Sequence, residues 1–166
     1  MQPAEYWITH LQLQPHPEGG FYRETYRAPK EISLDGIPSR FQGPRSISTA
    51  IYFLLRTQDR SLFHRIKSDE LWHFHAGDAL SIYVLTHHGL ITHKLGTNLE
   101  HGEVLQVVIP ADHWFGAIVE EKGSYTLSSC TVAPGFDFRD FELADRVRLL
   151  QEFPMHKEII TRLTPS

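Results

Sequence analysis

The chain has 166 residues, of which 41% are hydrophobic and 22% are charged, the profile of one globular domain spanning residues 1–166. The formal net charge is −4 and no run of Lys or Arg exceeds two. We expect no nucleic-acid partner, because phosphate binding needs a concentrated basic face. Cys130 is the single cysteine, which excludes an intramolecular disulfide. The sequence has no leader-like start and no apolar stretch approaching the roughly 18 residues of a membrane span, so we expect a cytoplasmic protein with no membrane partner.

Helix signals occur only near the two ends of the sequence. Pro3 suits a first helical turn, and Trp7, Ile8 and Leu11 recur on one face before Pro15 ends the pattern. We therefore predict a short amphipathic helix near the start of the chain.

Between the ends, the sequence predicts short strands separated by turns. The nine runs rich in strand formers are 21–27, 48–55, 63–66, 70–75, 79–86, 90–95, 104–109, 115–119 and 125–132. Short strands at near-regular spacing with glycine turns predict an antiparallel sandwich or barrel. The irregular segment 28–45, with three prolines and two glycines, predicts a loop lying over the barrel.

The last part of the sequence predicts a second helix. Asp140 suits the N-cap position, and Leu143, Val147 and Leu150 then recur at helical spacing until Pro154. We expect this helix to act as a lid or as a packing element.

Two segments resemble the sequence motifs of the cupin family. His64, Glu70 and Gly77 are spaced like the first histidine, the glutamate and the glycine of the first cupin motif. Ile66 stands in the place of the second histidine of that motif. A later proline turn followed by a strand resembles the second cupin motif, with Phe115 in the place of its histidine.

Five blocks of sequence extend this resemblance to one cupin subfamily, Cupin_5 or DUF985. The blocks lie at residues 15–24, 48–54, 64–77, 110–116 and 133–136. The resemblance implies an all-β fold, the double-stranded β-helix or cupin jelly-roll barrel, with short N- and C-terminal helices. It also implies a homodimer. The subfamily has no established activity, although its members have been compared with sugar-nucleotide epimerases.

The alternation of side chains along strands predicts which residues meet in a pocket. Residues two apart on a strand share a face, so Glu70, Trp72 and Phe74 point to one side. If His64 faces the barrel interior, Glu70 meets it there across the turn at residues 67–69. We therefore predict a pocket with a histidine, a carboxylate and an aromatic wall.

In one interpretation, His64 and Glu70 are catalytic. A histidine with an ordinary pKa of about 6.5 suits proton transfer near neutral pH, and a carboxylate orients it. An epimerase or isomerase that acts beside a carbonyl group needs a base on one face and an acid on the other, and Tyr22, Tyr52 or Tyr83 would supply the second group. The alternative is structural, because buried His–Glu pairs also form to satisfy each other's hydrogen bonds.

In a second interpretation, the pocket holds a metal ion. Cupin metal centres present three histidines and a glutamate, a set that suits Fe, Mn, Ni or Zn. His113 lies two residues before Phe115, which keeps the same facing on a regular strand, so His64, Glu70 and His113 would form a divalent-metal site. Because Ile66 and Phe115 occupy two ligand positions of the motifs, we favour a protein without a cofactor.

Further candidates would bind a ligand without reacting. The glycine pair at residues 19–20 permits close approach of a ligand, and Arg23 suits a forked contact to a carboxylate or phosphate. The alternative is a tight turn in which Arg23 pairs with Glu24. The predicted ligand-binding residues are Glu18, Tyr22, Arg23, Tyr52, Trp72, Phe74, His113 and Phe115.

These observations favour a cupin that binds a small polar or anionic molecule, such as a sugar or nucleotide derivative, in its barrel. Acid–base processing of that ligand would make it an enzyme of the epimerase or isomerase type. The alternatives are a metal-dependent dioxygenase or isomerase, and a non-catalytic, ligand-binding homodimer. Both enzyme interpretations require an open cavity beside His64.

Overall fold

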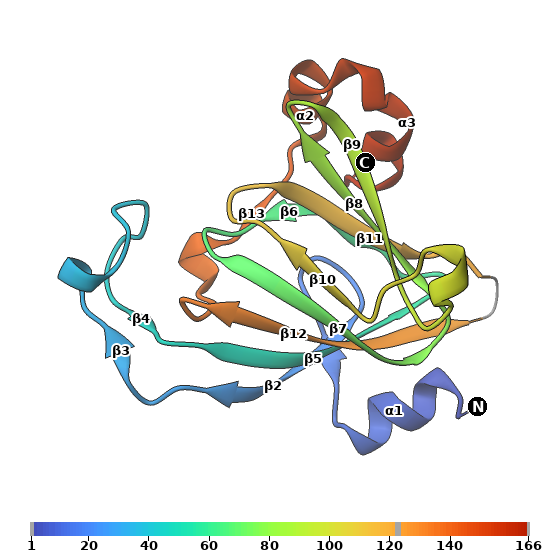
Figure 1. Ribbon diagram of the computed structural model, residues 1–166, viewed down its shortest axis with the longest axis horizontal. Coiled ribbons are helices and arrows are strands. Elements are labelled where there is room, and N and C mark those ends of the chain that lie inside the picture. Colours follow the sequence, from blue (N-terminus) through green and yellow to red (C-terminus); the bar gives the residue numbers. More distant parts are fainter. Residues whose placement is uncertain (1, 122–123, 166) are drawn as a thin grey trace.

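The computed structural model describes residues 2–121 and 124–165, and its strands form two facing sheets (Figure 1). The six-stranded sheet has the order β1 (Gln14–Pro15), β2 (Phe21–Arg27), β5 (Thr49–Arg56), β12 (Tyr125–Ala133), β7 (Asp69–Gly77), β10 (Gln106–Ile109). The five-stranded sheet has the order β13 (Glu142–Leu143), β6 (Ser61–Arg65), β11 (Trp114–Val119), β8 (Leu80–Thr86), β9 (Gly89–Leu95). Neighbouring strands in both sheets are antiparallel. All nine predicted strands are present, as β2 and β5 to β12.

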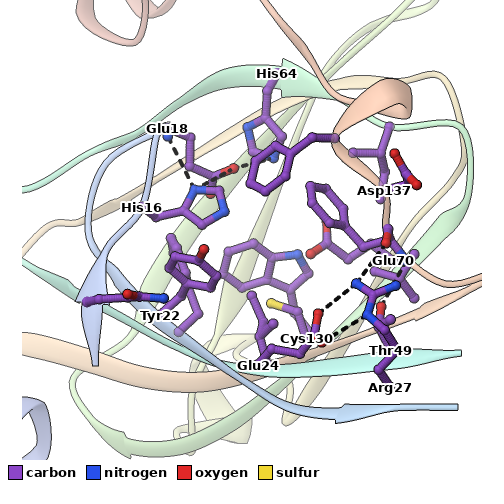
Figure 2. A pocket seen from close by; sticks show the side chains of 18 residues that line it. His16, Glu18, Tyr22, Glu24, Arg27, Thr49, His64, Glu70, Cys130 and Asp137 are labelled. Carbon is purple, nitrogen blue, oxygen red and sulfur yellow. Dashed lines mark hydrogen bonds and ion pairs between the residues drawn. The ribbon is translucent and has the colours of Figure 1, made fainter. Parts of the chain in front are cut away.

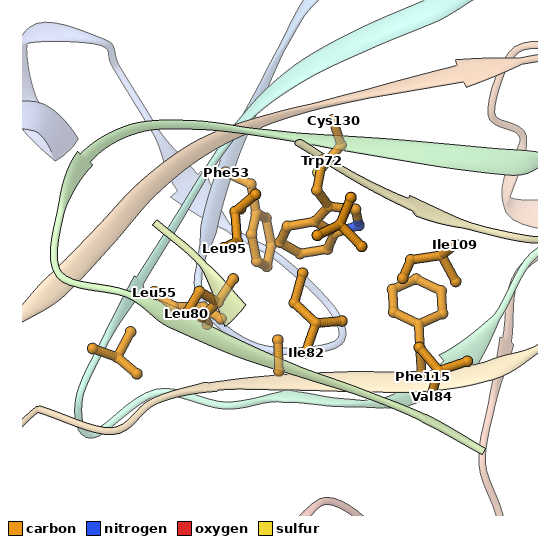
Figure 3. Packing of buried hydrophobic residues seen from close by; sticks show 13 residues of the cluster. Phe53, Leu55, Trp72, Leu80, Ile82, Val84, Leu95, Ile109, Phe115 and Cys130 are labelled. Carbon is orange, nitrogen blue, oxygen red and sulfur yellow. The ribbon is translucent and has the colours of Figure 1, made fainter. Parts of the chain in front are cut away.

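The hydrophobic core lies between the two sheets (Figure 3). Alternate residues of each strand point inward, among them Phe53 and Leu55 of β5 and Ile82 and Val84 of β8, all buried. Burial of each such side chain contributes about 2 kcal/mol to folding. The packed side chains hold the two sheets at a fixed separation.

Helices cover the outer faces of the sheets. The predicted first helix is confirmed as α1 (Ala4–His10), which packs Trp7 and Ile8 against the six-stranded sheet. The C-terminal elements α2 (Arg146–Glu152), η4 (Pro154–His156) and α3 (Lys157–Arg162) pack on the outer face of the five-stranded sheet. They are therefore a packing element and not a lid. None of the helices in residues 2–121 and 124–165 has the length and apolar character to cross a membrane.

The start of the second helix differs from the prediction. The N-cap of α2 is Asp145, whose side chain accepts a hydrogen bond from the backbone N–H of Arg148 at 2.9 Å. Asp140 instead ends a short turn of helix, η3 (Phe138–Asp140), and Leu143 lies in β13. The prediction for Asp140 was wrong because its carboxylate is used in a long-range ion pair.

That ion pair joins η3 to the segment 28–45. Arg45 donates two hydrogen bonds of 2.7 Å to the two carboxylate oxygens of Asp140, and both side chains are buried. The segment is not a loop across the barrel as predicted. It contains β3 (Glu31–Ile32), η1 (Leu34–Gly36) and β4 (Arg45–Ser46), and β3 and β4 form a small sheet that projects from the side of the barrel (Figure 1). A further short turn, η2 (Leu99–His101), follows β9.

Candidate functional site

A cavity of about 490 Å³ lies at the end of the barrel where β5 and β7 begin and β12 ends (Figure 2). This volume is typical of a small-molecule site. Its polar lining residues are Gln14, His16, Glu18, Tyr22, Glu24, Arg27, Thr49, His64, Glu70, Cys130 and Asp137. Its apolar lining residues are Ile51, Phe53, Ile66, Trp72, Val132, Phe136 and Phe138.

His64 is paired with Glu18 and not with Glu70. The Nε2 atom of His64 lies 2.9 Å from Oε2 of Glu18, and both side chains are buried. The hydroxyl of Ser61 donates a 2.7 Å hydrogen bond to Oε1 of the same carboxylate. On the other side of the ring, Nδ1 of His64 lies 2.7 Å from the backbone carbonyl oxygen of Leu62.

This geometry favours the imidazolium form of His64. A carbonyl oxygen only accepts hydrogen bonds, so Nδ1 carries a proton, and the carboxylate at Nε2 favours a second one. Burial opposes the charge, but Glu18 outweighs it and raises the pKa of His64. Burial also opposes ionisation of Glu18, yet the charge and hydrogen bond of His64 prevail and lower the pKa of Glu18. With both ring nitrogens donating, His64 has no lone pair to accept a proton or to ligate a metal.

His16 lies beside this pair as a neutral ring (Figure 2). Its Nδ1 atom accepts a 3.2 Å hydrogen bond from the backbone N–H of Glu18, so this nitrogen carries no proton. Burial lowers the pKa of His16, although the charge of Glu18 acts in the opposite direction. The ring of Tyr22 packs edge-on against His16, with 4.5 Å between the ring centroids. His16 therefore contributes a polar wall without adding charge.

The loop that presents Glu18 depends on glycine. Gly19 has a φ of 112°, and a Cβ atom there would lie 2.0 Å from the backbone oxygen of Arg60, so a larger residue does not fit. The backbone carbonyl of Glu18 accepts a 3.0 Å hydrogen bond from the backbone N–H of Leu62. Of the two alternatives for the glycine pair, this packing favours the tight turn, although Arg23 contacts Gln12 and not Glu24.

Glu70 lies on the sheet opposite His64. It occupies β7, where it is in register with Ile109 and Val132, and its side chain lines the cavity. Burial raises the pKa of Glu70 to about 7, although the charge of His64 acts in the opposite direction. Its carboxylate forms no ion pair with any side chain in residues 2–121 and 124–165. Glu70 is therefore the cavity carboxyl group whose pKa burial brings close to neutrality.

Two forked ion pairs lie near the mouth of the cavity. Arg27 donates hydrogen bonds of 2.9 and 2.7 Å to the carboxylate oxygens of Glu24, and one of 3.1 Å to the backbone oxygen of Phe136. Arg139 contacts both carboxylate oxygens of Asp137 at 2.9 and 2.7 Å, and these hydrogen bonds lower the pKa of Asp137. Each acidic side chain at the mouth is thus already paired with an arginine.

Comparison with known proteins identifies the family. Residues 5–144 match the family model described as "Cupin superfamily (DUF985)". The chain belongs to this cupin family. Protein SO0799 from Shewanella oneidensis is 41% identical, with a TM-score of 0.88 over 99% of both chains. A hypothetical protein from Leishmania major is 35% identical, with a TM-score of 0.90 over 99% of this chain and 100% of the other.

A curated relative extends the family to yeast. The uncharacterized protein YML079W of Saccharomyces cerevisiae is 31% identical over 143 residues, which are 80% of this chain and 71% of the yeast protein. The family match confirms the predicted cupin jelly-roll barrel. It leaves the activity open, since these relatives carry no functional description.

The cupin barrel brings half of the predicted site residues to the cavity. His64, Glu70, Glu18, Tyr22 and Trp72 line it. The open cavity beside His64 meets the condition that both enzyme interpretations require. The predicted partnership is different, however, because Glu18 and not Glu70 contacts His64.

The other five predicted ligand-binding residues do not line the cavity, which corrects the predicted lining. Arg23 and Tyr52 alternate with inward-facing neighbours and point to the outer face, where Arg23 contacts Gln12 at 3.4 Å. Phe74 packs against the core between the sheets, and Phe115 is part of that core. His113 precedes β11, and its side chain does not line the cavity.

The predicted metal set of His64, Glu70 and His113 is not assembled. Asp112 has a φ of 64° in the turn before β11, which breaks the strand alternation on which the prediction relied. The Nδ1 atom of His113 lies 3.0 Å from the backbone oxygen of Ala111, and the side chain does not line the cavity. Within residues 2–121 and 124–165, no three His, Cys, Asp or Glu side chains are placed to hold a metal ion. The donor set therefore does not fit the metal centre of a typical cupin.

Several lining residues were missed by the sequence analysis. Glu24 was identifiable, because it lies two residues after Tyr22 on one strand and shares its facing. Arg27 was harder to predict from sequence, because a register shift between Glu24 and Tyr26 turns its side chain to the same side as that of Glu24. His16 and the segment 136–138 reach the cavity only through the tertiary fold, and no local pattern indicates their position.

Proposed function

We propose that this cupin binds a small polar organic molecule in its cavity and exchanges a proton with it through Glu70. One observation carries the proposal: Glu70 is a buried carboxyl group that lines the cavity, has no ion-pair partner among the described residues and has a pKa of about 7. A group that titrates near the working pH is suited to both accepting and donating a proton. Unpaired buried carboxyl groups are costly to maintain, and such perturbed groups concentrate at functional sites.

In this proposal, Glu70 takes the role that the sequence analysis gave to His64. His64 is held as an imidazolium by Glu18 and Leu62, so its contribution is electrostatic. Its positive charge stabilises the ionised form of Glu70 and would stabilise negative charge that develops on a bound molecule. The Glu18–His64 pair thus prepares the cavity for the reaction without exchanging its own protons.

The reaction class that suits this arrangement is isomerisation beside a carbonyl group. Glu70 would remove a proton from the carbon next to the carbonyl, the electron pair would move to the carbonyl oxygen as an enolate, and a proton would return to the carbon. Tyr22 is the candidate for the returning acid, because it lines the cavity, whereas Tyr52 packs on the outer face and Tyr83 donates a hydrogen bond to Glu120.

Metabolite capture tests the binding step. The parent protein is incubated with the small-molecule fraction of a cell extract, washed by ultrafiltration and analysed by mass spectrometry. Val132→Phe, which fills the cavity, should abolish the enrichment. Val147→Phe, at an exposed position of α2, should retain it. If no compound is enriched with the parent, or if Val132→Phe retains the same compounds, the proposal of a cavity ligand is wrong.

Deuterium exchange tests the proton-transfer step. The enriched compound is incubated in D2O with the parent or with Glu70→Gln, and the carbon-bound deuterium is measured. We expect incorporation with the parent and at least a hundredfold slower incorporation with Glu70→Gln. Binding without any exchange would favour the non-catalytic alternative, in which the cavity only holds its ligand.

A further inference from the structure

We propose that the ligand of this cavity is a small organic cation, an amine or a quaternary ammonium compound, held between the Glu70 carboxylate and aromatic walls. The inference rests on the proposed function, since it specifies the ligand class of the same cavity. It also replaces the anionic ligand expected from the sequence.

The charges around the cavity disfavour an anion. Its two cationic side chains are already neutralised, Arg27 by Glu24 in a forked contact and His64 by Glu18 at 2.9 Å. Glu70 has no such counterpart among the described residues. The remaining lining carboxylate, Asp137, is paired with Arg139, so an ionised Glu70 is in excess of the balanced pairs. An organic cation would supply the missing charge, whereas a phosphate or carboxylate would face repulsion at this point.

The apolar lining of the cavity suits a cation with alkyl groups. Five aromatic side chains line it: Tyr22, Phe53, Trp72, Phe136 and Phe138. Ring faces attract ammonium groups through their quadrupole, and a cage of several rings with a carboxylate is the usual site for quaternary ammonium groups. A strongly hydrated inorganic cation would gain little from these rings, so the lining favours an organic one.

Proton linkage provides a signature of this ligand class. A cation beside Glu70 favours its ionised form, so binding near neutral pH should release a proton and strengthen as the pH rises. The titratable groups that act most strongly on Glu70 are His64 of β6, Glu18 of the loop before β2 and Cys130 of β12. The other titratable or charged lining residues are His16, Tyr22, Glu24, Arg27 and Asp137. Each partner of the Glu18–His64 pair favours the ionised form of the other, and burial raises the pKa of Cys130 well above its ordinary value. We therefore assign the expected proton release to Glu70, whose pKa is about 7.

Three probes of matched shape test the charge preference: choline, its neutral carbon analogue 3,3-dimethylbutan-1-ol, and the anion 3,3-dimethylbutanoate. Each is titrated calorimetrically into the parent protein at pH 6 and pH 8, in buffers of different ionisation enthalpy. We expect choline to bind most tightly and to release protons. Its affinity should rise about tenfold between the two pH values, as does the ionised fraction of a group with a pKa of about 7.

A pair of variants tests whether Glu70 causes the preference for choline and its pH dependence. Glu70→Gln should lose most of the preference for choline over the neutral alcohol, and the pH dependence should disappear. Glu152→Gln makes the same chemical change on exposed α2 and should behave as the parent. If Glu70→Gln does not fold, the pH dependence and proton release of choline binding to the parent still test whether a carboxyl group is the counterion.

Each contrary outcome overturns the cation proposal. If the alcohol or the anion binds as tightly as choline, the cavity takes small molecules but does not select cations, and the proposed function survives. If choline binds without proton release, Glu70 is not its counterion. If none of the probes binds, the cation proposal fails, and the metabolite-capture experiment separately decides the proposed function.

Discussion

Oε2 of Glu18 lies 2.9 Å from Nε2 of His64, so the histidine of the first cupin motif is held by a residue from the loop before β2. The glutamate of the same motif, Glu70, lies on the opposite sheet and has no ion-pair partner within the described part of the chain. The two acidic residues thus have distinct roles. Glu18 fixes a buried positive charge, and Glu70 is free to titrate.

Replacing Glu18 should destabilise the fold. Glu18→Gln leaves His64 without its counterion in a buried site, and we expect a loss of about 3 kcal/mol in the free energy of unfolding, measured by urea denaturation. Glu24→Gln breaks an exposed pair and should cost no more than about 1 kcal/mol. Equal effects of the two substitutions would contradict the assignment of a buried ion pair.

The pH dependence of this loss of stability follows from the pKa shifts of Glu18 and His64. The pKa of Glu18 is lowered from 4.5, so its contribution to stability is present above that pH and is lost as the pH falls through the folded-state value. The pKa of His64 is raised from 6.5, so its contribution is present below that pH and is lost as the pH rises through the folded-state value. The difference between parent and Glu18→Gln should therefore be largest between pH 4.5 and 6.5.

Replacing Glu70 should stabilise the fold at alkaline pH. The pKa of Glu70 is raised from 4.5 to about 7, so the folded protein keeps a proton that the unfolded chain has released. Stability falls as the pH rises through this window, and Glu70→Gln removes the penalty. We expect a gain of about 3 kcal/mol at pH 8 and almost none at pH 4, measured by urea denaturation at both values. A gain that does not vary with pH would show that Glu70 does not titrate as proposed.

The buried Arg45–Asp140 pair should be important for stability. Arg45→Met leaves the Asp140 carboxylate buried, with Lys67 Nζ still 3.9 Å from it, and we expect a loss of about 3 kcal/mol. Arg139→Met removes an exposed arginine from the same turn and serves as the control. Thermal unfolding of both variants measures the difference, and similar melting temperatures would disprove a special role for Arg45.

The homodimer implied by the family resemblance stays a prediction. Val108 lies in edge strand β10 and Leu105 directly precedes it, and the two side chains are 49% and 54% exposed. An interface between two copies would explain this exposure. Light scattering should then give twice the 19.1 kDa of one chain. Val108→Asp should reduce that mass to one chain, while Val147→Asp on exposed α2 should not. A parent mass near 19.1 kDa would remove the dimer.

Local patterns were sufficient to predict the strands and part of the site. Alternation and turn residues located nine strands, because both features are set by residues adjacent in sequence. The two-residue strands β1, β3, β4 and β13 were not predicted. The facing of Glu70 and Trp72 followed from the same rule. The rule failed at His113, where the positive φ of Asp112 interrupts the strand.

Contacts between distant segments could not be predicted in this way. The partner of His64 comes from a loop that Gly19 allows to approach β6, and no spacing along the chain indicates that approach. Asp140 has the sequence signature of a helix cap, yet Arg45 draws it into a buried pair. In both cases the deciding partner is supplied by the tertiary fold.

The chemistry of the cavity and its shape depend on different parts of the fold. The carboxyl that titrates belongs to the sheet, whereas Phe136 and Phe138 belong to a connecting segment that the Arg45–Asp140 pair fastens from outside the barrel. Substitutions in the connecting segment would change the shape and size of the admitted molecule and leave the chemistry at Glu70 intact. Members of the family could therefore diverge in substrate range while retaining one reactive group.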